Sequence, residues 1–562
     1  MNRTPMKPAE ISLSTKGICL NWIILMMLFY CPFLLSAVEK KPKIDIWNRF
    51  EITLNSPVSY TNPVYDVAIE GIFTSPSGKQ YKAEGFWDGG NSWKIRFMPN
   101  EKGTWHFQTR CTDLTNGALH HQTGQFTCKR NRSPLAIYRH GKITHQKGNY
   151  HLTHADGTPF FYLGCTAWNG AMRSTDEEWK TYLDHRKENH YTAIQFITTQ
   201  WRGLPAEALE EPAFTGIDTL TIHPAFFQAL DRKIEQINQA GLIAAPVMLW
   251  AWKGAGNPGI DLPIPSAIQL AKYIKARYDA YHVLWNLGGD GIFTDGNAAK
   301  WKQIGRAVFG ETDAQQRIVT LHTAGFQWYA NEYDGETWLD LISYQTGHAN
   351  SESAVRWKTR GPVTANWRSL IPRPIIDTEP VYEAQGEQEN DYEVRKSILW
   401  SIFSAPVAGV GYGAWSTWPW LRIGETSYNH GMKKPSKYTW EDGIRSKASI
   451  QVGRLPLFFN QFKWWELRPA PERLKKRNDE KNVFNTAMAL ADTDARTVLV
   501  YVPTVQTLRI SHTLPATLKT AQWYYPATGT YKTASVTHGP NYIEATSDSD
   551  TDAILMLRFR TK

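Results

Sequence analysis

The chain has 562 residues and a formal net charge of +9, from 62 Lys and Arg against 53 Asp and Glu. At roughly 150 residues per domain, this length predicts about three or four domains. A content of 42% hydrophobic and 20% charged residues is typical of globular proteins and excludes a wholly disordered chain, a collagen and a coiled coil. Because no Lys/Arg run accompanies the mild charge, we expect no nucleic-acid partner. The positive charge would suit an acidic polysaccharide or indicates no partner in particular.

Aromatic residues are abundant, with 24 Trp, 25 Tyr and 23 Phe. Flat aromatic faces beyond the needs of a core are typical of proteins that bind sugars. Heavy core packing is the alternative explanation, so this composition by itself does not decide the function.

The first residues have the pattern of a targeting segment. Three basic residues precede an apolar run over 18–35, and Leu35-Ser36-Ala37 is a suitable cleavage site. This pattern predicts a signal peptide over 1–37 and therefore an exported protein, periplasmic, cell-surface or extracellular, with no stable membrane insertion after cleavage. Since the apolar run borders on the length that spans a bilayer, an uncleaved anchor is the alternative.

Three cysteines lie beyond this segment, Cys111, Cys128 and Cys165. The alternation over 105–111 and 124–128 predicts that Cys111 and Cys128 face one core. In an exported protein such a pair can oxidise to a disulfide, and two buried free thiols are the alternative. No Cys/His spacing resembles a zinc site, so we expect no metal.

Residues 41–136 show the period-two alternation of short strands, separated by turn signals such as Asp88-Gly89-Gly90-Asn91. This region is predicted to be an N-terminal β-sandwich. The predicted strands are 47–54, 65–74, 93–98 and 105–111.

Residues 137–465 change to short apolar strands that alternate with helical segments, which predicts a central (β/α)8 TIM barrel in an α/β fold. Ser174 and Glu177 predict a capping box at one helix start, and apolar spacing over 227–237 predicts a helix that ends at Gly241. The eight predicted strands are 160–164, 192–197, 242–249, 282–287, 317–322, 339–345, 374–377 and 408–412.

A proline-marked junction over 464–471 leads into a last region with short strands and turn-rich spacers. Residues 470–562 are therefore predicted to be a small C-terminal β-sandwich. Its predicted strands are 497–502, 508–512, 521–525 and 553–559.

Two acidic residues stand where strands of the predicted barrel end. Asp290 lies between glycines at the end of strand four, and Glu379 precedes Pro380 at the end of strand seven. Strands four and seven lie nearly opposite in an eight-strand ring, and two opposed carboxyls are what glycosidic cleavage needs. An ordinary turn acid and an ordinary helix-start acid are the alternative. Asp377 competes with Glu379, because strand alternation places both on one face.

Polar and aromatic residues end the neighbouring strands, and such a ring suits a sugar. The predicted substrate-binding residues are Trp168, Asn169, Trp201, Trp250, Trp252, Asn286, His322, Gln345, Tyr382 and Trp415. A packing or capping role is the alternative for each of them. The chain has no G-x-S-x-G, H-E-x-x-H or G-x-x-x-x-G-K-[ST] motif, and no cofactor is expected.

Several segments resemble apiosidase-like glycoside hydrolases. They are 148–168 at the entry to the barrel, 284–290 with its Gly-Gly-Asp, and 377–383 with its Glu-Pro. Residues 41–130 and 470–562 resemble the β-sandwich and the C-terminal β domain, sometimes labelled collagen-binding, that flank these barrels. The resemblance implies a retaining glycosidase with Asp290 as acid/base and Glu379 as nucleophile, and an activity that releases apiose from pectic side chains.

The endings of strands two and three, 200–202 and 250–253, depart from the family pattern, so the sugar stays open. We therefore expect a secreted glycoside hydrolase whose partner is a plant or algal poly- or oligosaccharide. A non-catalytic carbohydrate-binding surface protein on a degenerate barrel is the alternative. Hydrolysis that depends on the two acids distinguishes the first from the second.

Overall fold

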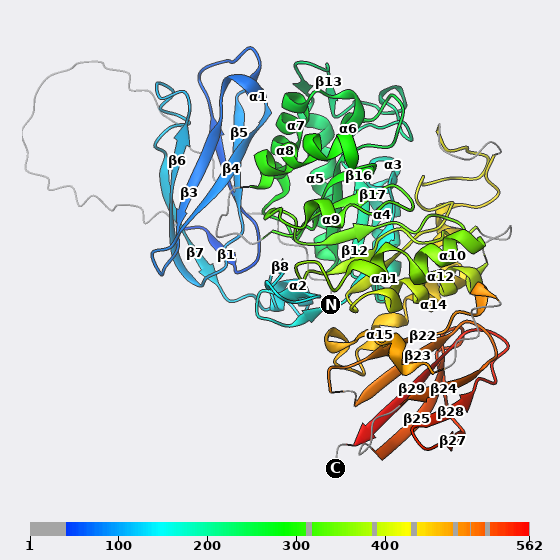
Figure 1. Ribbon diagram of the computed structural model, residues 1–562. Helices are drawn as coiled ribbons and strands as arrows, with labels where there is room; N and C mark the ends of the chain where they lie inside the picture. Colours follow the sequence, from blue (N-terminus) through cyan, green and yellow to red (C-terminus); the bar gives the residue numbers. More distant parts are fainter. Residues whose placement is uncertain are drawn as a thin grey trace, which may run out of the picture. The chain divides into compact units, whose positions relative to one another are not determined.

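A computed structural model describes residues 41–310, 317–384, 390–428, 435–475, 482–494, 496–511 and 517–560 (Figure 1). The predicted signal peptide over 1–37 lies outside these residues. Within the described ranges, no helix is both long enough and apolar enough to cross a membrane. The chain divides into two compact units, one up to Ser133 together with Ala276–Ala280, and the other formed by the remaining residues.

The first unit is rich in strands, which form one sheet in the order β1-β7-β6-β3-β4-β5-β2. Phe50 of β2 nevertheless stacks on Phe126 of β7 with ring centroids 4.0 Å apart, although these strands lie near opposite ends of the sheet. Phe73 of β3 stacks on Phe97 of β5 at 4.1 Å. The sheet therefore folds over so that its two halves share an aromatic core. Its elements are β1 (Lys43–Asp45), β2 (Phe50–Asn55), α1 (Pro63–Asp66), β3 (Ile69–Thr74), β4 (Gln80–Gly89), β5 (Ser92–Phe97), β6 (Gly103–Cys111) and β7 (Thr123–Lys129).

Cys111 and Cys128 are both buried and free. Strands β6 and β7 are antiparallel, and their register pairs Cys128 with Gly103 at the start of β6, whereas Cys111 is the last residue of β6. At about 3.4 Å per residue, eight residues of strand separate the two positions by roughly 27 Å. The alternation placed both thiols in a core but did not give the register, which keeps them from pairing.

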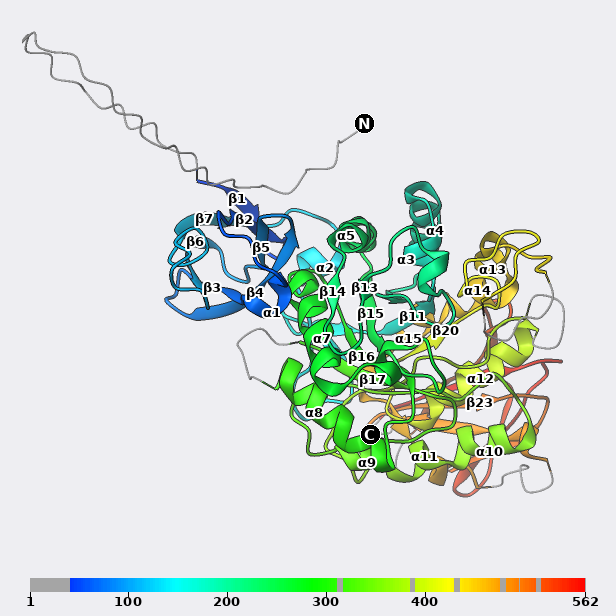
Figure 2. The ribbon, with the colours of Figure 1, turned by 90° about the horizontal axis from the view of Figure 1, so that it is seen from above.

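The second unit begins with a central region in which parallel strands alternate with helices. Six strands form one sheet in the order β17-β16-β15-β12-β11-β20, and β18 and β19 form a parallel pair. Helices surround these strands when the molecule is viewed from above (Figure 2). The strands are β8 (Ile143–Thr144), β9 (Leu152–His154), β10 (Pro159–Phe160), β11 (Tyr162–Thr166), β12 (Ala193–Ile197), β13 (Phe214–Thr215), β14 (Thr221–Ile222), β15 (Ile243–Trp250), β16 (Trp285–Gly291), β17 (Val319–Thr323), β18 (Ile342–Tyr344), β19 (Ile375–Asp377) and β20 (Gly409–Tyr412). The helices are α2 (Ala136–Arg139), α3 (Gly170–Arg173), α4 (Asp176–Glu188), α5 (Pro224–Gln239), α6 (Pro258–Asp261), α7 (Ile264–Tyr278), α8 (Ala298–Phe309), α9 (Ala330–Tyr333), α10 (Glu352–Arg360), α11 (Pro362–Asn366), α12 (Asp391–Ser404), α13 (Trp440–Arg445), α14 (Lys447–Val452) and α15 (Leu455–Phe459).

The β18–β19 pair contacts both edge strands of the six-stranded sheet. The backbone N–H of Asp340, just before β18, donates to the carbonyl of Val319 in β17 at 3.0 Å. At the other edge, a Cβ on Gly411 of β20 would lie 2.1 Å from the carbonyl oxygen of Thr378, which follows β19. One hydrophobic cluster takes a residue from each of the eight strands or from the residue just before it: Tyr162, Ala193, Ile243, Leu284, Ile318, Leu341, Ile376 and Ala408.

Two local predictions about helix ends had different outcomes. The capping box before α4 is formed by Thr175 and Glu178, one residue later than the predicted pair, because Ser174 closes the preceding helix α3. Helix α5 ends at Gln239, and Gly241 follows with φ of +88°, which confirms the predicted glycine stop.

The C-terminal strands form two sheets, β21-β22-β23-β29-β25-β26 and β24-β28-β27. A shared core joins them and includes Val500 and Leu555 from the first sheet and Ile510 and Ile543 from the second. The strands are β21 (Arg468–Pro469), β22 (Met488–Ala491), β23 (Thr497–Val502), β24 (Thr507–Ser511), β25 (Thr517–Tyr525), β26 (Thr530–Thr533), β27 (Val536–His538), β28 (Tyr542–Thr546) and β29 (Ala553–Arg560). His512, the last residue of one predicted strand, lies outside the described residues.

Candidate active site

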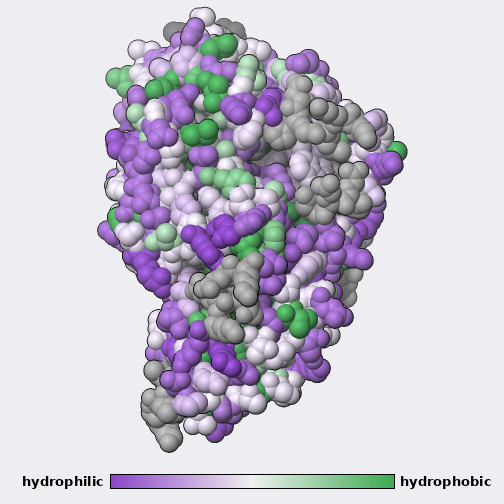
Figure 3. Space-filling view, turned by 45° about the vertical axis from the view of Figure 1, so that its right-hand side comes forward, coloured by the Kyte–Doolittle hydropathy of each residue, from purple (hydrophilic) through white to green (hydrophobic). Residues whose placement is uncertain are grey.

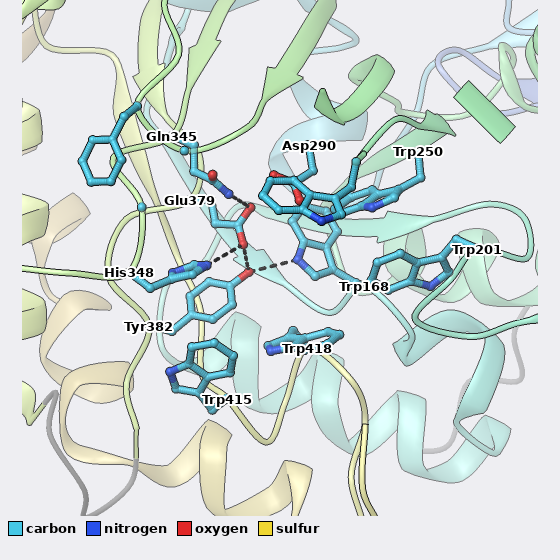
Figure 4. A pocket seen from close by; sticks show the side chains of 14 residues that line it. Trp168, Trp201, Trp250, Asp290, Gln345, His348, Glu379, Tyr382, Trp415 and Trp418 are labelled. Carbon is cyan, nitrogen blue, oxygen red and sulfur yellow. Dashed lines mark hydrogen bonds and ion pairs between the residues drawn. The ribbon is translucent and has the colours of Figure 1, made fainter. Parts of the chain in front are cut away.

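A cavity of about 370 Å³ opens where the strands of the central region end (Figure 4). Each of the eight parallel strands, or the loop that follows it, contributes to the wall, as expected for the carboxyl ends of parallel strands. The lining residues are Trp168, Trp201, Trp250, Trp252, Asp290, Gly325, Phe326, Gln345, Gly347, His348, Glu379, Tyr382, Trp415 and Trp418.

Asp290 lies inside β16, which extends four residues beyond the predicted strand end and through the glycine-rich segment. The pairing of β16 with β17 shifts register twice between Asn286 and Gly291, and Asp290 has φ of +52°. Such left-handed backbone is costly for a residue other than glycine and is found preferentially at functional sites. Gly289 is required here because a Cβ would lie 2.5 Å from the ring of Trp250.

Glu379 follows β19 and receives hydrogen bonds at both carboxylate oxygens (Figure 4). Oε2 accepts from Nε2 of His322 at 2.7 Å and from Nε2 of Gln345. Oε1 accepts from the hydroxyl of Tyr382 and lies 3.4 Å from Nε2 of His348. Four surrounding side chains therefore fix the orientation of this carboxylate.

Asp377, the rival of Glu379 in the sequence, does not share its face of the strand. Its Oδ2 accepts from the hydroxyl of Ser401 in α12 at 2.6 Å, and it does not line the cavity. The prediction of a shared face was wrong because β19 ends at Asp377. The N–H of Glu379 then turns back to Oδ1 of Asp377 at 3.3 Å, so strand alternation does not continue.

The pKa values of the two carboxyls that line the cavity are displaced in opposite directions. Burial, followed by the negative charge of Glu379, raises the pKa of Asp290 well above its usual value. Burial acts in the same direction on Glu379, but hydrogen bonds from His322 and His348 and the charges of these residues outweigh it and hold the pKa of Glu379 well below its usual value. The site thus favours a protonated Asp290 beside an ionised Glu379.

Tryptophans form the wall opposite Glu379 (Figure 4). The ring centroids of Trp168 and Trp250 lie 5.3 Å apart, and those of Trp201 and Trp250 lie 4.7 Å apart. Trp168 is also tied to the carboxylate, since its Nε1 donates to the hydroxyl of Tyr382 at 2.9 Å and that hydroxyl donates to Glu379. The wall therefore offers stacking faces next to the ionised acid.

The structure brings seven predicted substrate-binding residues to the cavity wall together with both acids: Trp168, Trp201, Trp250, Trp252, Gln345, Tyr382 and Trp415. Three others do not line it. Asn169 lies behind Trp201, whose Nε1 donates to its Oδ1 at 2.7 Å, and Asn286 donates to the carbonyl of Ala245 at 3.4 Å. His322 is fully buried and contacts Glu379 from behind.

Sequence reasoning did not identify His348, Trp418 or Phe326 as cavity residues. Phe326 lies three residues after the end of β17, and His348 and Trp418 lie three residues after the lining residues Gln345 and Trp415. All three stand in loops, whose course cannot be predicted from sequence periodicity. Phe326 has φ of +61°, a backbone conformation that residues other than glycine rarely adopt. Among the described residues, no cluster of three or more His, Cys, Asp or Glu side chains could hold a metal ion.

Comparison with known families decides the class of this site. Residues 146–466 match the family described as the apiosidase-like catalytic domain. The chain belongs to the apiosidase-like family. It is therefore a glycoside hydrolase, and its cavity with two acids lies within the matched catalytic region. Residues 43–112 match a family described as a domain of unknown function, DUF5060. A comparison with curated proteins gives no significant match.

Solved structures show that the apiosidase-like chain shares its fold with glycoside hydrolases. A family 5 glycoside hydrolase from Bacteroides vulgatus ATCC 8482 is 21% identical, with a TM-score of 0.64 over 75% of this chain and 94% of that one. A presumed glycoside hydrolase from the same organism is 19% identical, with a TM-score of 0.67 over 92% of this chain and 100% of that one. A third structure, titled "Glycoside hydrolase", is 22% identical, with a TM-score of 0.62 over 75% and 97%.

Proposed function

We propose that this apiosidase-like protein is an exported enzyme that cleaves a glycosidic bond in a plant or algal polysaccharide by a retaining mechanism with two carboxyl groups. The proposed architecture is a (β/α)8 barrel over 137–465, closed through β18 and β19, with a β-sandwich over 41–136 and another over 470–562. The cluster that draws on all eight strands and the likeness to glycoside hydrolase folds support the barrel.

One observation carries the mechanism: Asp290 and Glu379 line the same cavity with proton affinities displaced in opposite directions. Glycosidic cleavage needs one carboxyl that gives a proton and another that is ionised. The environment of Asp290 supplies the first, and the donors around Glu379 supply the second. A pair of surface acids with ordinary proton affinities would not divide these roles.

In the first step, the Glu379 carboxylate attacks the anomeric carbon while Asp290 gives its proton to the glycosidic oxygen. The bond between the anomeric carbon and that oxygen breaks, the leaving part departs as an alcohol, and a glycosyl ester forms on Glu379. In the second step, Asp290 takes a proton from water, and the resulting hydroxide attacks the anomeric carbon. The ester bond then breaks, which returns Glu379 as a carboxylate and Asp290 as an acid.

The sugar in this proposal stacks on the indole wall and donates hydroxyl hydrogen bonds to the polar side of the cavity. Trp252 extends the wall, and the Arg202 guanidinium lies 5.6 Å from its ring centroid. The charge of Arg202 acts on Asp290 and opposes the rise in its pKa. Stacking faces on one side and fixed polar groups on the other are the usual composition of a sugar site.

The test compares the wild type with Glu379→Gln and Asp290→Asn on a panel of pectic and algal polysaccharides. Both variants should lose at least about 10³-fold in kcat with the fold intact, because Asp290→Asn removes the proton donor and Glu379→Gln removes the nucleophile. Asp184→Asn, on the exposed surface of α4, is the matched control and should keep full activity. NMR of the first product should show the anomeric configuration of the substrate.

Full turnover by either site variant would refute the assignment of the two acids. A product of inverted configuration would refute the retaining mechanism but leave the acids in place. If the wild type binds glycans without releasing any sugar, the non-catalytic alternative holds. Export is tested separately, because a cleaved signal peptide leaves a mature N-terminus near residue 38 that sequencing of the protein from its cells detects.

A further inference from the structure

The loop over 345–350, which follows β18, carries two of the side chains that hold Glu379. Gln345 donates to Oε2 of Glu379, and Nε2 of His348 lies 3.4 Å from Oε1. The same Gln345 amide hydrogen-bonds Asp290. The position of the 345–350 loop therefore affects both oxygens of the proposed nucleophile and the proposed acid.

Asp377 holds the beginning of this loop from behind the cavity. Its Oδ2 accepts from the hydroxyl of Thr346 at 2.7 Å and from Ser401 of α12, while its Oδ1 accepts from the backbone N–H of Glu379. One carboxylate thus joins the 345–350 loop, the backbone of Glu379 and helix α12. Its side chain is 1% exposed and is absent from the cavity wall.

Lys358 of α10 holds the other end of the loop. Its Nζ donates to the carbonyl of Ala349 at 3.1 Å and to Oδ1 of Asn350 at 2.7 Å. Asn350 in turn donates to the backbone carbonyl of Glu393 in α12 at 2.9 Å. Lys358 is also 1% exposed, and its charge and that of Asp377 attract each other.

Two buried charged groups are expensive, and apolar residues of similar volume would often give equal or greater stability at such positions. Here the pair does what apolar side chains cannot do, because directional hydrogen bonds fix both ends of a loop that has little regular structure. The four groups that the pair contacts along this loop and strand are Thr346, Ala349, Asn350 and the N–H of Glu379.

We propose that Asp377 and Lys358 are positioning residues for the reaction: they clamp the 345–350 loop at its two ends so that Gln345 and His348 hold Glu379 in its reactive orientation. This inference rests on the proposed function, since it requires Glu379 to react. Neither residue touches the substrate in this arrangement. Their effect on the rate acts through Gln345, His348 and the backbone of Glu379.

The experiment compares wild type, Asp377→Asn, Lys358→Met and the double variant in kcat, KM and the pH profile of kcat/KM. Each single variant should lower kcat by about 10²-fold, the usual effect of a misplaced reactive group, with KM changed less than about threefold. The acidic limb of the profile should move to higher pH, because a Glu379 carboxylate with fewer donors is easier to protonate. Hydrogen exchange should show faster exchange over 345–350.

The double variant separates positioning from stability. Each single variant leaves one buried group without the opposite charge that attracts it, whereas the double variant removes both charges, so the melting temperature should recover in part. The rate should not recover, because both attachments of the loop are gone. Asp552→Asn, which removes a different buried acid from its partner Arg395, is the matched control and should lower stability without moving the acidic limb.

Four outcomes are decisive. A double variant with wild-type kcat and an unmoved acidic limb would overturn the inference, as would an active wild type whose loop exchange is unchanged by Asp377→Asn. If the wild type hydrolyses no glycoside while Asp377→Asn still speeds hydrogen exchange over 345–350, the proposed function is wrong, but Asp377 does hold the loop in place. Slow variants with a shifted limb and a faster-exchanging loop would support both.

Discussion

Asp290 and Glu379 are both buried, so burial alone would raise the pKa of each carboxyl. Their neighbours make the difference. His322 and His348 face Glu379, whereas the charge that acts most strongly on Asp290 is the negative one of Glu379 itself. Because histidines contact Glu379 and not Asp290, Asp290 is the acid that carries the proton.

This asymmetry predicts the pH dependence of the reaction. Activity requires a protonated Asp290, whose pKa is raised, and an ionised Glu379, whose pKa is lowered. Raising the pH through the pKa of Asp290 removes the acid, and lowering it through the pKa of Glu379 removes the nucleophile. The profile of kcat/KM should therefore stay level through mildly acidic pH and fall on the alkaline side.

Steady-state kinetics on an aryl glycoside with a good leaving group check this expectation. With such a substrate, Asp290→Asn should retain measurable first-step activity and should lose the alkaline limb, because no acid remains to titrate. Activity that already falls as the pH drops toward the ordinary range of a glutamate would contradict the depressed pKa of Glu379.

At the residue scale, the sequence singled out the two acids that line the cavity because glycine or proline residues stand next to them. Glycines surround Asp290, and Pro380 follows Glu379. His348 and Trp418 had no such mark, since their positions depend on the path of loops. Asn169 was expected at the substrate but lies behind Trp201, because the turn after β11 directs its amide toward the indole N–H. Tertiary contacts, which no local pattern records, decided these cases.

At the element scale, β20 owes its place to alternating glycines. A Cβ on Gly409 would lie 2.0 Å from the carbonyl oxygen of Tyr162 in β11, and one on Gly411 would lie 2.1 Å from that of Thr378. A Cβ on Gly413 would meet the ring of Tyr382 at 2.1 Å. The backbone of β20 therefore packs directly against Thr378, which precedes Glu379, and Gly413 just after β20 packs against Tyr382, which donates a hydrogen bond to Glu379.

Gly411→Ala should accordingly damage both stability and catalysis. The new methyl group must displace the Thr378 carbonyl, and the strain should cost about 1–3 kcal/mol of unfolding free energy and at least about tenfold in kcat through the adjacent Glu379. Urea unfolding and steady-state kinetics measure the two effects. Gly335→Ala is the control, since its Cβ would meet nothing within 4 Å. Equal behaviour of the two variants would contradict the proposed close approach.

The sequence predicted β20 as a strand but not this reason for its glycines, because the partner carbonyls come from residues far away in the chain. The same limit explains the shifted capping box at α4. Ser174 and Thr175 both stand three residues before a glutamate, and only the end of α3 assigns Ser174 elsewhere. The parallel direction of the strands in the central region followed from the alternation of strand and helix, since parallel strands need crossovers.

At the scale of the whole molecule, the C-terminal strands are joined to the central region through α12 and α15. Arg395 of α12 donates to Asp552, which precedes β29, at 2.8 Å, and both side chains are buried. Nε1 of Trp400 donates to the carbonyl of Thr486, and the ring of Phe458 stacks on that of Tyr524 at 4.3 Å. These contacts make one compact unit of two regions that the sequence separates by a proline-marked junction.

Breaking this attachment should cost stability across the unit. Asp552→Asn leaves Arg395 buried without its main charge partner, and we expect a loss of about 3 kcal/mol in unfolding free energy. Glu544→Gln, which removes the partner of exposed Arg509 among the C-terminal strands, should cost less than about 1 kcal/mol. Thermal unfolding checks both values. A separate early transition for the C-terminal strands in the wild type would contradict the single unit.

The hydropathy of the exposed surface is also a property of the whole molecule. The face in Figure 3 is largely hydrophilic, with small and scattered hydrophobic groups. Isolated apolar side chains are normal on a folded protein and do not by themselves mark an interface. Nine tryptophans are among the largest fully buried side chains of the described residues, and three of them, Trp201, Trp250 and Trp418, line the cavity.

The separation of Cys111 and Cys128 along β6 and β7 affects how the protein responds to its chemical surroundings. Burial raises the pKa of the Cys128 thiol to about 12 and also raises that of Cys111, so neither forms much of the thiolate that alkylating agents and oxidants attack. The first unit keeps its shape through aromatic packing and backbone pairing, with no covalent cross-link between these strands. Reductants such as glutathione thus have no bond to break there, and the unit is as suited to a reducing host cytosol as to an oxidising medium.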